Sequence, residues 1–61
     1  MAAKVDFVIV ESGVASVQYS SGKMTVYGNG KAIPDSIYRF CNRAADKGRV
    51  KHDGENRAKF Y

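Results

Sequence analysis

The sequence predicts a small α+β domain in which one amphipathic helix packs on an antiparallel sheet. Residues 4–27 form three short segments rich in β-branched and aromatic side chains, and glycine-containing turns separate them. Residues 34–47 instead carry apolar side chains three and four positions apart, which is the period of a helix. Alternation then returns in the last segment. We therefore expect the order β-β-β-α-β-β in a single domain, residues 1–61.

The first expected strand, residues 4–10, has apolar side chains on both of its faces. Alternation predicts that Val8 and Val10 share one face and that Phe7 and Ile9 share the other. The face with Val8 and Val10 is too apolar to be plain solvent surface. We therefore expect it either to lie under the helix or to meet another protein chain.

The next two expected strands are residues 14–20 and 23–27, joined by a tight turn at Ser21-Gly22. The first alternates cleanly, with Ala15 and Val17 on its inner side. In the second, Met24 and Val26 are the inward-facing side chains that the pattern favours. Together with the first strand, these segments predict a meander with short connections.

The helix is expected over about 12–14 residues that begin near Pro34, a residue suited to a first helical position. Gly48 is placed to end the helix in a left-handed cap. Every fourth position of this segment is basic, so a positive stripe should run beside the apolar face. The apolar face is formed by Ile37, Phe40, Cys41, Ala44 and Ala45, and the stripe by Arg39, Arg43 and Lys47.

The last fourteen residues, GRVKHDGENRAKFY, are expected to form a hairpin with a three-residue loop at residues 53–55. That register pairs Val50 with Ala58 and Lys51 with Arg57. It turns the apolar side chains inward and leaves four cations on the outer side, where they repel one another. These cations are Arg49, Lys51, Arg57 and Lys59.

The charge is distributed unevenly, and this asymmetry predicts an anionic partner. Residues 1–30 hold two cations and two carboxylates, whereas residues 31–61 hold eight cations and four carboxylates, so the whole net charge of +4 lies in the second half. If the helix stripe and the hairpin cations merge, they form one patch that suits nucleic-acid phosphates of DNA or RNA. Tyr38 in the helix and Tyr61 after the last strand are both candidates to stack on an exposed base. The predicted nucleic-acid contacts are Arg39, Arg43, Lys47, Arg49, Lys51, Arg57, Lys59 and Tyr38.

The composition argues against an enzyme, a metal site or a cofactor. Cys41 and His52 are the sole cysteine and histidine, and together they cannot supply the four ligands of an ordinary zinc site. A nucleophile and a base would also need a pocket, an orienting group and an oxyanion donor. We therefore expect a non-enzymatic binding protein without catalytic residues, metal or cofactor.

A protein-binding regulator or inhibitor is the alternative function, in the manner of the small accessory proteins of phages and plasmids. Its interface would be the apolar strand face with Val8 and Val10, and the same face makes a homodimer a further expectation. The chain has no apolar run of the roughly 18 residues that a membrane span requires, and it shows no export-signal pattern. We therefore expect a cytoplasmic protein that does not enter a membrane.

Overall fold

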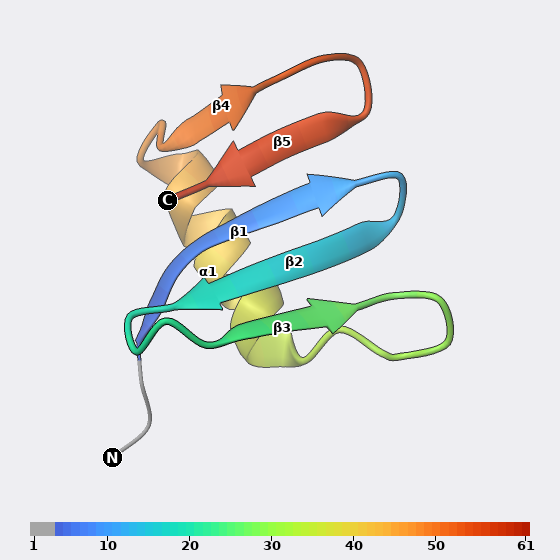
Figure 1. The fold of residues 1–61 in the computed structure, drawn as a ribbon. Coiled ribbons are helices and arrows are strands. Elements are labelled where there is room, and N and C mark those ends of the chain that lie inside the picture. The colour runs from blue at the N-terminus through green and yellow to red at the C-terminus, as the bar shows by residue number, and fades with distance from the viewer. Residues whose placement is uncertain (1–3) are drawn as a thin grey trace.

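The computed structural model describes residues 4–61 and shows five strands and one helix in the predicted order (Figure 1). The elements are β1 (Val5–Glu11), β2 (Val14–Tyr19), β3 (Met24–Tyr27), α1 (Asp35–Asp46), β4 (Val50–His52) and β5 (Arg57–Phe60). The strands form one antiparallel sheet in the order β3-β2-β1-β5-β4. The predicted α+β fold with a C-terminal hairpin is confirmed.

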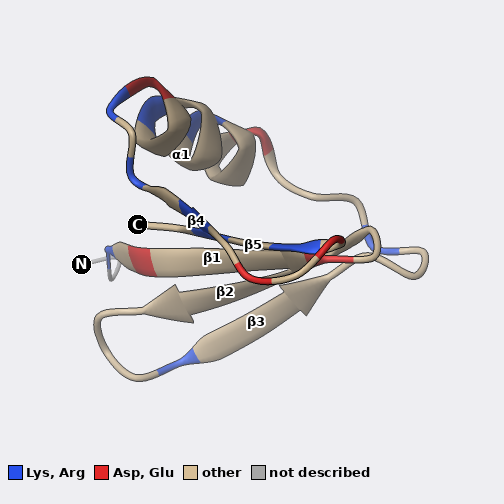
Figure 2. Cartoon of the chain, turned by 90° about the horizontal axis from the view of Figure 1, so that it is seen from above, with Lys and Arg blue, Asp and Glu red and all other residues tan. Residues whose placement is uncertain are grey.

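The central strand is β1, because β5 returns beside it and pairs Val8 with Phe60 and Val10 with Ala58. The helix lies across one face of the sheet, and no helix or strand of residues 4–61 covers the other, which we call the open face (Figure 2). Among residues 4–61, the buried apolar core consists of Val8, Ala15, Val17, Ile37 and Ala44. The sheet therefore buries a single face, as one helix on one sheet requires.

Val8 and Val10 do not form an exposed interface, which corrects one of the two expectations for this face. Val8 is 0% exposed, and Val10 packs against the core around it. Both side chains lie beneath the helix because β1 occupies the middle of the sheet. Of the two alternatives, the structure selects burial under the helix.

Two strands differ from the alternation that the sequence suggested. The register shifts between Val5 and Phe7, so a bulge at this point brings Val5 to the core side together with Val8. In β3, Met24 and Val26 are 57% and 48% exposed and do not face inward as predicted. Both alternating sets in β3 contain apolar side chains, and pairing with β2 places Tyr27 against the core instead.

The helix begins one residue later than predicted and ends where predicted. Pro34 occupies the N-cap position, with extended φ and ψ of −62° and 149°, and Asp35 is the first helical residue. Gly48 has a φ of +71° and its N–H donates to the carbonyl of Ala45. The N–H of Arg49 donates to the carbonyl of Ala44 over 2.7 Å. These two hydrogen bonds form a Schellman motif, which holds Arg49 against the last turn of the helix.

Strands β4 and β5 of the C-terminal hairpin keep their predicted faces but have a different register, and Arg49, predicted on the outer side, instead lines a hollow beside the helix with Phe40 and Arg43. Lys51 pairs with Lys59 and Val50 pairs with Phe60, two positions away from the predicted partners. The N–H of Asp53 donates to the carbonyl of Arg57, so the loop comprises residues 54–56. A shift of two positions preserves which side chains share a face. It also brings Phe60 next to Val8, where it packs against the core.

The connection from β3 to the helix starts with a tight turn in which Gly28 and Lys31 exchange two backbone hydrogen bonds. Asn29 and Gly30 both have positive φ, as a two-residue hairpin turn of this type requires. Gly28 has a second constraint. A Cβ atom at this position would lie 3.0 Å from the carbonyl oxygen of Gly13 and 3.1 Å from the Cα of Val14.

We expect Gly28→Ala to lower the free energy of unfolding by about 1–3 kcal/mol more than Gly30→Ala does. Both glycines have positive φ, so both alanines are strained, but nothing lies within 4 Å of a Cβ at Gly30. Urea denaturation followed by circular dichroism measures the difference. Equal losses in the two variants would contradict the predicted backbone clash.

Candidate functional site

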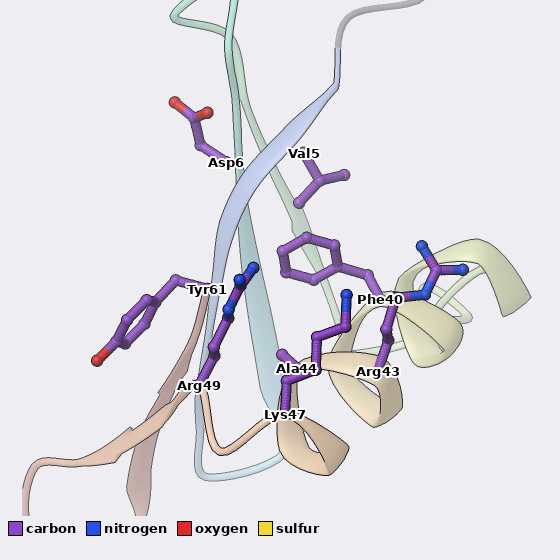
Figure 3. A pocket seen from close by; sticks show the side chains of 8 residues that line it. All are labelled: Val5, Asp6, Phe40, Arg43, Ala44, Lys47, Arg49 and Tyr61. Atoms are coloured by element: carbon purple, nitrogen blue, oxygen red, sulfur yellow. The ribbon is translucent and has the colours of Figure 1, made fainter.

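Five cations surround a groove that runs between the helix and the start of β1. Two adjoining hollows, of about 290 and 500 Å³, make up this groove and share Val5, Phe40 and Arg43 in their walls (Figure 3 shows the first). We call it the basic groove. Its cations are Lys4, Arg39, Arg43, Lys47 and Arg49.

Local structure explains how these cations come together. The four-residue spacing places Arg39, Arg43 and Lys47 along one flank of the helix. The Schellman motif then folds Arg49 back beside the helix end. On the opposite wall, the N–H of Ser20 donates to the Lys4 carbonyl over 2.8 Å and anchors the backbone that enters β1.

Lys4 is a site residue that sequence reasoning missed. It lies one position before the first strand. Residues 1–30 have no net charge, because two carboxylates balance Lys4 and the other cation, so the charge distribution gives no signal for Lys4. It joins the groove because β1 crosses the sheet beneath the basic flank of the helix. This proximity depends on packing between segments more than thirty positions apart in the chain.

The groove cations lack close acidic partners. Within residues 4–61 one ion pair is formed, between Asp53 and Arg57 at 3.9 Å, and it lies in the hairpin outside the groove. Asp6 is the one carboxylate among the groove-lining residues. Five positive side chains and one negative side chain therefore give the groove a net charge of +4.

The remaining predicted cations lie on the open face of the sheet. Lys51, Arg57 and Lys59 line a hollow of about 360 Å³ together with Phe7, Ile9 and Asp53. Side chains alternate along β4 and β5, so these cations point away from the core when Val50 and Phe60 point toward it. The predicted single patch of seven cations is thus divided between the basic groove and this second site, the open-face hollow, and the two have no lining residue in common.

Tyr38 is separated from both groups of cations. It is 53% exposed and lines an apolar hollow with Ile33, Ile37 and Phe60 on the other flank of the helix. No lysine or arginine lines this hollow. The exposed tyrosine that does line the basic groove is Tyr61, which is 48% exposed.

Cys41 and His52 do not share a cavity. Cys41 lines the apolar hollow of Tyr38, and His52 is not among its lining residues. Within the described chain, residues 4–61, no cluster of three or more metal-ligating side chains occurs. In the same range, no helix has the length and apolar character needed to cross a membrane.

Comparison of the chain with protein-family models, curated proteins and solved structures yields no significant match.

We expect Cys41 to react more slowly with iodoacetamide at neutral pH than a fully exposed cysteine does. Burial raises the pKa of this thiol, and the thiolate is the reactive form. The alkylation rate should therefore keep rising at pH values above the ordinary thiol pKa. Rates measured against pH, with the urea-unfolded chain as control, check this. Identical profiles for the folded and unfolded chains would contradict it.

Proposed function

We propose that this protein is a non-enzymatic nucleic-acid-binding protein whose basic groove holds the phosphate backbone. The observation that carries the proposal is the gathering of five cations around one groove, none of which forms an ion pair within residues 4–61. Like charges three or four positions apart on a helix destabilise it by about 0.2–0.5 kcal/mol per pair. Arg39, Arg43 and Lys47 form two such pairs, and an anionic ligand relieves their repulsion.

Phosphate is the anion that this groove fits best. A groove made of two adjoining hollows, with cations from both the helix and the strand side, can contact successive phosphates, whereas a single small anion would meet only a few of the cations. Arg39, Arg43 and Arg49 bring guanidinium groups, which bind phosphate oxygens through two parallel hydrogen bonds. Contacts of this kind give affinity with little preference for base sequence.

We expect binding to weaken with salt along a log–log slope of about −3.5 for a single strand or −4.5 for a duplex, because five phosphate contacts release counterions. Arg43→Gln/Lys47→Gln should reduce the magnitude of that slope by about 1.4–1.8. Fluorescence anisotropy of a labelled oligonucleotide, titrated at several salt concentrations, measures both values.

The matched control is Lys23→Gln/Lys31→Gln, which removes the same charge from exposed turn positions outside the groove. Its slope should stay at the wild-type value. An equal reduction in both variants would mean that overall charge, and not the groove, determines affinity. Absence of binding at low salt would refute the proposed function.

Protein binding is the second candidate function, and the exposed edge strand β3 supports it. Met24 and Val26 are both more than 45% exposed there, and the outer backbone edge of β3 has no neighbouring strand in the described sheet. A second copy of the chain is the occupant that charge favours. Pairing of two β3 edges would place the basic β4–β5 edges at opposite ends of a joined sheet.

If this second candidate is right, the chain will show the mass of a dimer at high concentration. Val26→Lys should return it to a monomer because the new charges meet across the pairing edge. Multi-angle light scattering over a range of concentrations tests this, and Gln18→Lys is the control, because it adds the same charge to the same sheet face on β2, away from the pairing edge. A monomeric mass for the wild-type chain at every concentration would exclude the homodimer.

A further inference from the structure

Two aromatic rings flank a lysine on the open face of the sheet. The Nζ atom of Lys59 lies 4.5 Å from the ring centroid of Phe7 and 5.8 Å from the ring centroid of Tyr61. Cation–π attraction of this kind is effective within about 6 Å. The two rings thereby hold the ammonium group over the sheet surface, and they keep it from extending freely into solvent.

The cross-strand partner of Lys59 is also a cation. Lys51 pairs with Lys59 directly across β4 and β5, and both line the open-face hollow. Like charges in that position destabilise a sheet. The ion pair of the hairpin is formed by Asp53 and Arg57, and neither lysine takes part in it. An anion bound between Lys51 and Lys59 would remove the repulsion.

Tyr61 connects this hollow to the basic groove. It is one of the residues that line the groove beside Arg49, and its ring, which points away from the helix in Figure 3, approaches Lys59. Its backbone N–H donates to the carbonyl of Arg49 over 3.0 Å, which fixes the chain end to the start of β4. A ligand that leaves the groove past Arg49 therefore meets an exposed ring first and two lysines next.

Resting on the nucleic-acid function proposed above, we propose that the ligand is a single strand that stacks a base on Tyr61. Its backbone runs along the basic groove and passes around the end of β5, and the next phosphate lies between Lys59 and Lys51. The two groups of cations belong to opposite faces of the sheet. A stiff duplex cannot follow both faces, whereas a flexible strand can, and any base can stack on an aromatic ring.

Phe7 acts in this arrangement as a positioning residue. It is half-buried on the open face. Its contact with Lys59 fixes the position of the ammonium group before the phosphate binds. Leucine at this position would keep an apolar side chain of similar size but lose the ring. The contribution of Phe7 to affinity should therefore depend on the presence of Lys59.

The test uses the full chain and labelled oligonucleotides of about 12 nucleotides, a length that small single-strand binding folds cover. Single-stranded DNA, single-stranded RNA and the matching duplex are compared by fluorescence anisotropy at one low salt concentration. We expect the single strands to bind more tightly than the duplex. Tyr61→Ala should weaken single-strand binding by at least about fivefold, the lower bound for loss of one stacked base, and Tyr61→Phe should restore it.

Tyr38→Ala is the matched control, because Tyr38 is exposed to a similar degree but lies on the other flank of the helix. It should leave single-strand affinity unchanged. In a double-mutant cycle, Phe7→Leu should weaken binding in the wild-type background and have no effect in Lys59→Ala. The chain contains no tryptophan, so quenching of tyrosine fluorescence on binding gives a second readout that Tyr61→Phe should abolish.

Three outcomes would overturn the proposal. Tighter binding of the duplex, with Tyr61→Ala equal to Tyr38→Ala, would refute the single-strand assignment while the proposed nucleic-acid function remains. Independent effects of Phe7→Leu and Lys59→Ala would remove the positioning role of Phe7. Absence of binding to all three oligonucleotides would refute the proposed function itself and this inference with it.

Discussion

The architecture of this protein depends on the packing of one helix against one face of a five-stranded sheet. Residues 4–61 supply a single amphipathic helix, and that helix covers Val8, Ala15 and Val17 through Ile37, with Phe40 and Cys41 packed against the same cluster. No further element of the described chain covers the second face of the sheet. Small domains bury only about 60% of the surface of their unfolded chains, so an open face is consistent with this size. Both the basic groove and the open-face hollow follow from that one-sided packing.

The same packing sorts the charges. Helical periodicity places three cations on the flank of the helix, and strand periodicity places three more on the opposite face of the sheet. Tyr61, which follows Phe60 at the end of β5, lies between the two groups: it lines the groove, and its ring approaches Lys59. Phe60 is fixed by its pairing with Val8 in the core, so the direction of Tyr61 is determined by burial one position earlier. A core contact thus positions the aromatic ring of the candidate site.

Strongly patterned segments could be predicted from sequence, whereas features that depend on contacts between segments could not. The helix, its left-handed end at Gly48 and the faces of β2 each follow from one dominant local pattern. In β3 the set with Thr25 contains the aromatic Tyr27, which packs against the core, so alternation alone predicts the wrong side for Met24 and Val26. The bulge near Asp6 and the entry of Lys4 into the groove arise from tertiary packing. The prediction of a single basic patch is wrong because Lys51, Arg57 and Lys59 lie on the sheet face opposite the helix, whereas Arg49 joins the helix cations in the groove.

The clustered cations lower the stability of the unbound protein, whereas the proposed binding of an anionic ligand requires them. The stripe on the helix and the Lys51–Lys59 pair both cost free energy in the unbound protein, in a domain whose total stability is small. A ligand that binds the folded chain and not the unfolded chain raises the free energy of unfolding. The increase grows with the logarithm of the ligand concentration divided by Kd, and it offsets part of that cost. Neutral side chains in place of these cations would make the unbound fold more stable and the complex weaker. Retaining the cations is therefore reasonable if the bound form is the one that functions.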